Sequence, residues 1–94
     1  MKLQFEWDEN KAAENFAKHG ARFEDAMTVF GDPLTLTVED AAHSSDETRW
    51  VTVGRTATGE LLVVFYVERG DTIRIISARS ATARERKAYE EEPF

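Results

Sequence analysis

The spacing of apolar residues in the first third of the chain predicts one strand followed by two helices. Apolar and polar residues alternate over residues 3–7, as in a strand with one buried face. Asp8 stands where it can cap a helix over residues 9–19, which Gly20 is suited to end. We expect this helix to bury Ala12, Ala13, Phe16 and Ala17. A second helix is predicted over residues 23–30 by apolar residues at helical spacing, namely Phe23, Ala26, Met27 and Phe30.

The rest of the chain predicts a sheet and a final helix. Pro33 prevents the second helix from continuing. Residues 39–47 are polar, show no periodicity and predict a loop. Thr82 and Glu85 have the spacing of a capping box and predict a helix to about residue 91. Strands are predicted over residues 34–38, 49–54, 61–67 and 72–78.

The predicted order β-α-α-β-β-β-β-α is typical of an α+β fold, with helices packed on a mostly antiparallel sheet. Short links containing Gly59 and Gly70 join the last three strands, which favours antiparallel hairpins. The strand over residues 61–67 is apolar on both faces and should lie in the middle of the sheet. A length of 94 residues without internal repeats predicts a single domain, residues 1–94.

Composition excludes several classes of protein. The chain has no cysteine, so neither a disulfide framework nor a cysteine metal site is available, and no cofactor or metal site is expected. No apolar run approaches the ~20 residues of a membrane span, and the first eight residues are too polar for a signal peptide. We therefore expect a cytoplasmic protein that makes no membrane contact.

The net charge of −6 is unevenly distributed. Residues 1–48 carry four basic and eleven acidic residues, whereas residues 49–87 carry eight basic and four acidic ones. The basic segment could present a phosphate-binding surface, or its arginines could simply pair with the acidic half.

One helix face and several strand positions carry candidate chemistry. Lys11, Asn15 and Lys18 fall on one stripe of the first helix, with His19 at its edge; this is either a phosphate-binding face or a solvated one. Glu47 and Arg49 should share a side if the strand extends to both, and Arg55 continues the parity of Arg49. Arg69 lies in a predicted hairpin turn, Arg74 interrupts the apolar run of the last strand, and Arg79 ends that strand just before the final helix.

Arginine forks match phosphate oxygens bidentately, and an arginine-rich site with one carboxylate or histidine suffices for RNA cleavage without a metal. His43, in the polar loop, is expected to be a bystander. Tyr89 could stack on a base or anchor the last helix.

Short motifs along nearly the whole chain have a common order and spacing. They are Phe5-Glu6-Trp7-Asp8, Lys11, Asn15, Lys18-His19-Gly20, Phe23, Ala26, Val29-Phe30, Asp32-Pro33, Glu47, Arg49, Gly54, Arg69-Gly70-Asp71, Ile73-Arg74-Ile75-Ile76-Ser77-Ala78-Arg79, Ala81, Glu85-Arg86 and Tyr89. In these motifs the chain resembles the BrnT toxin family.

The resemblance implies a RelE-like fold and a metal-independent ribonuclease toxin that inhibits translation and arrests growth. It implies a BrnA-like antitoxin with a ribbon-helix-helix DNA-binding part, in a heterotetramer of two toxins and two antitoxins that reaches operator DNA through the antitoxin. The arginines would hold the scissile phosphate, Glu47 or His19 would transfer protons, and Lys18 would orient the RNA backbone. The expected catalytic residues are Lys18, His19, Glu47, Arg49, Arg69 and Arg79. Further RNA contacts are expected from Lys11, Arg55, Arg74 and Tyr89.

The sequence suggests two alternative functions. The chain could be a non-catalytic module that binds an acidic antitoxin segment and acts in operon autoregulation. Direct DNA binding by the chain is disfavoured, because no helix clusters basic residues for base recognition and the last helix is acidic towards its end.

Overall fold

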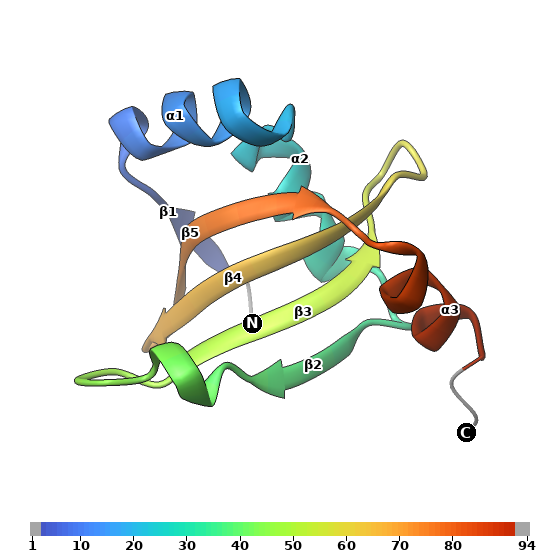
Figure 1. The fold of residues 1–94 in the computed structure, drawn as a ribbon. Coiled ribbons are helices and arrows are strands. Elements are labelled where there is room, and N and C mark those ends of the chain that lie inside the picture. Colours follow the sequence, from blue (N-terminus) through green and yellow to red (C-terminus); the bar gives the residue numbers. More distant parts are fainter. Residues whose placement is uncertain (1–2, 92–94) are drawn as a thin grey trace.

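The computed structural model describes residues 3–91, and its elements follow the predicted order (Figure 1). Two short 3-10 helices, η1 and η2, are added to it. The elements are β1 (Gln4–Glu6), α1 (Glu9–His19), α2 (Phe23–Thr28), η1 (Val29–Gly31), β2 (Leu36–Glu39), η2 (Ala41–His43), β3 (Arg49–Arg55), β4 (Leu61–Arg69), β5 (Thr72–Ser80) and α3 (Ala83–Glu91).

The five strands form one sheet in the order β1-β5-β4-β3-β2. The pairs β2–β3, β3–β4 and β4–β5 are antiparallel, as the glycine-containing links predict, while β1 pairs with β5 in parallel. Strand β4 lies in the middle of the sheet, which confirms the prediction from its apolar sequence. It contributes the buried residues Leu62, Val64 and Tyr66 to the core beneath the helices.

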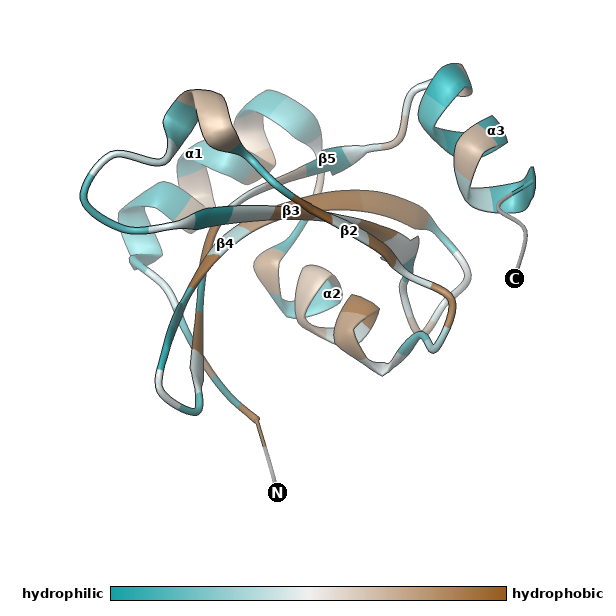
Figure 2. Ribbon diagram, turned by 90° about the horizontal axis from the view of Figure 1, so that it is seen from below, coloured by the Kyte–Doolittle hydropathy of each residue, from teal (hydrophilic) through white to brown (hydrophobic). Residues whose placement is uncertain are grey.

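Helix α2 covers one face of the sheet, whereas α3 lies on the opposite side (Figure 2). Phe23, Ala26 and Val29 from α2 and η1 are almost fully buried against apolar side chains of β4 and β5. We call the opposite side the front face. It carries Arg49, Val51, Val53, Val63, Phe65, Ser77 and Arg79, because residues paired across neighbouring strands point to the same side.

Helix α1 is capped as predicted but presents a different side to the protein. Asp8 accepts a hydrogen bond from the Lys11 N–H at 3.0 Å, and Gly20 ends the helix at φ 70°. The prediction that Phe16 is buried is wrong: it is 44% exposed, with the Arg22 guanidinium 4.4 Å from its ring centroid. Ala13 and Ala17 are exposed too, and Ala12 is half-buried.

The buried residue of α1 is Asn15, and its hydrogen bonds explain the rotation of the helix. The Asn15 side-chain amide donates to the carbonyl oxygens of Ala78 (2.8 Å) and Ala21 (3.0 Å), and its oxygen accepts from the Ala78 N–H (3.1 Å). Beyond the short strand β1 the outer edge of β5 has no strand partner among the residues that the structure describes. Asn15 therefore supplies the hydrogen bonds that a neighbouring strand would supply. If the helix were rotated to bury Phe16, Asn15 would point away from the edge of β5 and these hydrogen bonds would be lost.

Element boundaries differ from the predictions where side chains bond to the backbone. Helix α2 ends at Thr28, whose hydroxyl donates to the Asp25 carbonyl, and the chain tightens into η1 before Pro33. Residues 39–47 are not wholly irregular, since η2 lies among them. Strand β2 begins at Leu36 rather than residue 34, while β3, β4 and β5 each extend beyond the predicted end.

Candidate functional site

Three hollows border Ile76 and Ser77 on β5, and each is lined by one or both of these residues. The first, about 190 Å³, lies beside α1 and is lined by Lys11, Glu14, Asn15, Lys18, His19, Ile76 and Ser77. The second, about 160 Å³, is lined by Asp40, His43, Arg49, Phe65 and Ser77. The third, about 210 Å³, is lined by His43, Ser45, Asp46, Glu47, Arg49, Val67 and Ile76. We call these three hollows together the Ser77 cleft.

The end of α1 supplies one wall of the cleft. Lys11, Lys18 and His19 line the same hollow, as their helical spacing predicts. The stripe is not simply solvated, because Asn15 at its centre is buried against β5. The Ser77 hydroxyl donates to the Asn15 side-chain oxygen at 3.3 Å, which ties the cleft floor to α1. Two basic side chains in the last turn are also favoured by the helix dipole.

Arg49, at the start of β3, faces the cleft from the other side. Its Nε is buried and has no hydrogen-bond partner in the described structure, and no carboxylate among residues 3–91 forms an ion pair with it. Buried donors without partners are rare in folded proteins. The buried Nε is closed to solvent, so the groups that Arg49 offers to an anion are its outer guanidinium nitrogens, for which no hydrogen bond or ion pair is found among residues 3–91.

Arg79 lies on the same front face but is already engaged. Its guanidinium is 5.7 Å from the Phe65 ring centroid and forms a bidentate pair with Glu85 of α3, at 2.8 and 2.9 Å. Glu85 also completes the predicted capping box with Thr82. The hydrogen bonds from Arg79 lower the pKa of Glu85 to about 2, and the same pair raises the pKa of Arg79.

Glu47 and Arg69 belong to a charge network at the end of the β4–β5 hairpin. Arg69 donates to both Glu47 carboxylate oxygens, at 2.9 and 2.8 Å, and also approaches Glu6 at 3.7 Å. Arg74 pairs with Glu6 at 3.2 Å, which explains a charge within an apolar strand. The hydrogen bonds from Arg69 lower the pKa of Glu47. Glu47 precedes β3 instead of lying on it, yet it still borders the cleft.

Arg55 and Tyr89 lie at the opposite end of β3 from Arg49. The Tyr89 hydroxyl donates to Asp32 at 2.6 Å, and the Arg55 guanidinium lies 5.5 Å from the Tyr89 ring centroid and 3.6 Å from Glu90. Burial alone would raise the pKa of Asp32, but hydrogen bonds from Tyr89 and from the Arg55 and Leu34 N–H groups outweigh it and lower the pKa. Tyr89 thus anchors α3, one of the two roles that the sequence left open.

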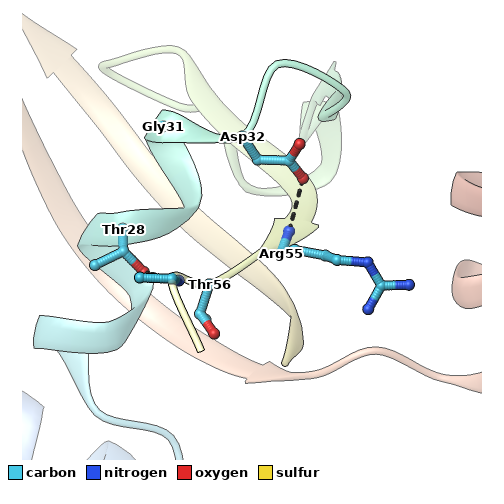
Figure 3. Close-up of a pocket in the computed structure, with 6 residues that line it drawn as sticks. Thr28, Gly31, Asp32, Arg55 and Thr56 are labelled. Carbon is cyan, nitrogen blue, oxygen red and sulfur yellow. Dashed lines mark hydrogen bonds between the residues drawn. The ribbon is translucent and has the colours of Figure 1, made fainter. Parts of the chain in front are cut away.

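A larger hollow of about 370 Å³ lies beside this end of β3, lined by Thr28, Gly31, Asp32, Arg55, Thr56 and Ala57 (Figure 3). Its polar groups already serve the fold: Asp32 accepts from the Arg55 N–H at 2.8 Å, and Thr28 accepts from the Ala57 N–H at 2.9 Å. The Arg55 side chain points away from Thr28 and Thr56. Volume alone therefore does not make this hollow the site, and the Ser77 cleft has the better chemistry.

Metal-binding clusters and membrane-spanning helices are both absent from residues 3–91. No group of three or more histidine, aspartate or glutamate side chains there is placed to hold a metal ion. None of the helices there is long and apolar enough to cross a membrane.

Comparisons with known proteins agree with the fold. A family model described as the ribonuclease toxin BrnT of type II toxin–antitoxin systems matches residues 7–85. The chain belongs to the BrnT family. The crystal structure of the Brucella abortus ribonuclease toxin BrnT has a similar fold, with a TM-score of 0.65 and 24% identity over 86% of this chain and 99% of that one. The predicted RelE-like α+β fold is confirmed, whereas no curated protein matches the chain.

The structure brings together only part of the site that the sequence predicts. Different hollows of the Ser77 cleft are lined by Lys11, Lys18 and His19 and by Glu47 and Arg49, while Arg79 lies on the front face with Arg49. Arg69, Arg74, Arg55 and Tyr89 lie in the two charge clusters beyond it. Ser77 and Asp40 are not among the site residues that the sequence predicts, and His43 is predicted to be a bystander. The available signal was the spacing of Asp40 and His43, which places both in one turn.

Proposed function

We propose that this BrnT-family chain is a metal-independent endoribonuclease that inhibits translation in the cytoplasm and is neutralised by a cognate antitoxin. Family membership supports the ribonuclease and toxin assignments. The observation that carries the rest is Arg49, a partly buried guanidinium without a carboxylate partner in the described structure, which lines two hollows together with His43 and one of them together with Ser77.

The cleft has the components that cleavage by the neighbouring 2′-hydroxyl requires. The 2′-oxygen attacks phosphorus and the bond to the 5′-oxygen breaks, which leaves a 2′,3′-cyclic phosphate and a 5′-hydroxyl. A positioned arginine on a phosphoryl transition state contributes roughly 10³–10⁵ in rate. Arg49 would hold the scissile phosphate, and Lys18 would orient the neighbouring one across Ser77. His19 would donate a proton to the leaving 5′-oxygen.

Arg79 would join this set only if the RNA competes with Glu85 for its guanidinium. Both of its outer nitrogens already donate to that carboxylate. A phosphate has a similar fork of oxygens and could replace the carboxylate. Arg79 therefore contributes a second, conditional contact on the same face.

The antitoxin partner belongs to the same proposal. Family membership places the chain in a type II toxin–antitoxin system, and we propose a BrnA-like antitoxin with a ribbon-helix-helix part. Two toxins and two antitoxins would assemble, and operator DNA would be bound through the antitoxin. The antitoxin would neutralise the toxin by covering the front face, where Arg49 and Arg79 lie.

The decisive experiment uses antitoxin-free, folded protein and a labelled RNA in EDTA. We expect cleavage with 2′,3′-cyclic phosphate ends, and growth arrest when the chain is expressed without the adjacent gene. Arg49→Ala should remove cleavage, whereas Arg84→Ala, at an exposed position on α3, should leave it unchanged. Intact RNA from folded protein would refute the proposal, and cleavage that requires added metal would refute its metal independence.

A second candidate is the non-catalytic antitoxin-binding module. The observation in its favour is that four of the predicted arginines, Arg55, Arg69, Arg74 and Arg79, already pair with carboxylates. Such a module would bind the antitoxin and repress the operon without growth arrest. The expression experiment separates the two functions directly.

A further inference from the structure

The Ser77 cleft needs a group that removes the proton from the attacking 2′-hydroxyl. Glu47 borders the cleft, but both of its carboxylate oxygens accept hydrogen bonds from Arg69, and its pKa is lowered. A carboxylate held in this way is a weak proton acceptor. The proton acceptor is therefore expected among the other groups that line the same hollows.

We infer that His43, oriented by Asp40, is the general base of this cleft; the inference rests on the ribonuclease function proposed above. The imidazole Nδ1 lies 3.0 and 3.1 Å from the two Asp40 carboxylate oxygens. His43 and Arg49 together line two of the three hollows, one of which contains Ser77. A base and a phosphate-binding arginine thus share one wall of the cleft.

The backbone fixes His43 relative to Arg49. The Asp40 N–H donates to the Arg49 carbonyl at 2.7 Å, and the Arg49 N–H donates to the Ser44 hydroxyl at 2.8 Å. That hydroxyl in turn donates to the Asp40 carbonyl at 2.9 Å. The turn that carries His43 is therefore fastened at both sides to the first residue of β3, which preorganises the pair for one substrate position.

Asp40 decides which imidazole nitrogen is available. An ionised carboxylate only accepts hydrogen bonds, so Nδ1 carries the hydrogen and Nε2 keeps its lone pair. The Asp40 side chain is 14% exposed, whereas that of His43 is 65% exposed. The carboxylate is packed into the protein, and the imidazole stands open to a ligand. Asp40 is thus a positioning residue that acts through His43.

Other charges face the same hollow and must enter any account of its pH dependence. Arg49 contributes a positive charge from β3, and Asp46 and Glu47 contribute carboxylates from the segment before it. Asp40 is the carboxylate in hydrogen-bonding contact with the imidazole.

The cleavage step needs no oxidant, reductant or further reactant. The 2′-hydroxyl proton moves to His43 Nε2 while the 2′-oxygen forms its bond to phosphorus. The bond between phosphorus and the 5′-oxygen breaks, and that oxygen takes a proton from the imidazolium of His19. The protonated His43 then returns its proton to solvent, and His19 is reprotonated from solvent.

The test measures single-turnover RNA cleavage in EDTA from pH 5 to 9 with the full chain. We expect His43→Ala to lower the rate by about 10² or more and to abolish the rise in rate over the range where imidazoles titrate. Added imidazole should restore part of the rate of this variant. Asp40→Asn should cause a smaller loss and keep the rise, while Asp71→Asn and Arg84→Ala serve as matched controls of unchanged rate.

Three outcomes would count against the inference. A His43→Ala protein that cleaves as fast as wild type excludes the base role, while the effect of Arg49→Ala still supports the nuclease. A slower variant with an unchanged pH profile and no response to imidazole makes His43 structural only. Wild-type protein that leaves RNA intact overturns the proposed function and this inference with it. Circular dichroism confirms that each variant is folded.

Discussion

Arg49 and Arg69 carry the same chemical group at the ends of neighbouring strands, yet the fold puts them in opposite situations. Arg69 sits in the hairpin-end network, 50% exposed, with both Glu47 oxygens and Glu6 around it. Arg49 is half-buried in the Ser77 cleft with an unpartnered Nε in the described structure. A charge that is already neutralised stabilises a surface weakly, whereas one held without a partner is available to a ligand.

Removing each arginine in turn tests the difference between Arg49 and Arg69 most directly. Arg49→Ala should lower the RNA cleavage rate by about 10³ or more, because the phosphate loses its main cationic contact. Arg69→Ala should leave most of the rate. The measurement is single-turnover cleavage of the same RNA by both variants. Equal losses would show that the hairpin-end network belongs to the active site.

The next largest effect concerns the floor of the cleft. Asn15→Ala should lower the free energy of unfolding by about 2–4 kcal/mol, because the edge of β5 and the Ala21 carbonyl lose buried hydrogen bonds. Urea unfolding measures the loss, and Glu14→Ala, one residue away and exposed, is the control. A change below about 0.5 kcal/mol would mean that water replaces the amide.

Asn15 also shows where sequence reasoning reached its limit. Helical spacing predicted the shared face of Lys11, Asn15 and Lys18, but not that its centre would be buried, since the β5 edge it closes lies 63 residues away in the chain. Apolar patterning likewise predicted the strands and the central place of β4. It misplaced Phe16, because an aromatic residue can be covered by a long cation such as Arg22 at the surface.

Charge pairing was even less predictable than burial. The sequence placed Arg74 on a strand correctly and Arg69 in a hairpin turn, whereas β4 extends to Arg69. Their carboxylate partners come from distant segments, as with Arg74 and Glu6 or Arg69 and Glu47. The contact between His43 and Asp40 was within reach, since both lie in one turn. It was missed because a histidine in a polar loop has no periodic pattern around it.

Arg79 is intermediate between Arg49 and Arg69, because it lies on the front face but is paired. Its partner Glu85 makes the free energy of unfolding depend on pH. The Glu85 pKa lies at about 2, below its ordinary value of 4.5, so the pair stabilises the fold fully above about pH 4.5. That stabilisation is lost as the pH falls from 4.5 through 2. With solvent screening it amounts to about 1–2 kcal/mol. Unfolding free energies of wild type and Glu85→Gln, which keeps the capping box, should differ at pH 6 and converge towards pH 2.

The smallest effect is expected at the partner of Arg69. Glu47→Gln removes the charge from a solvent-exposed pair, in which the Glu47 and Arg69 side chains are 44% and 50% exposed, so the free energy of unfolding should stay within the error of a urea titration. RNA cleavage should stay close to wild type, because the carboxylate is held by Arg69 and His43 takes the proton. A loss of cleavage as large as that of Arg49→Ala, with the fold intact, would make Glu47 the base and would place the two arginines on opposite sides of one substrate.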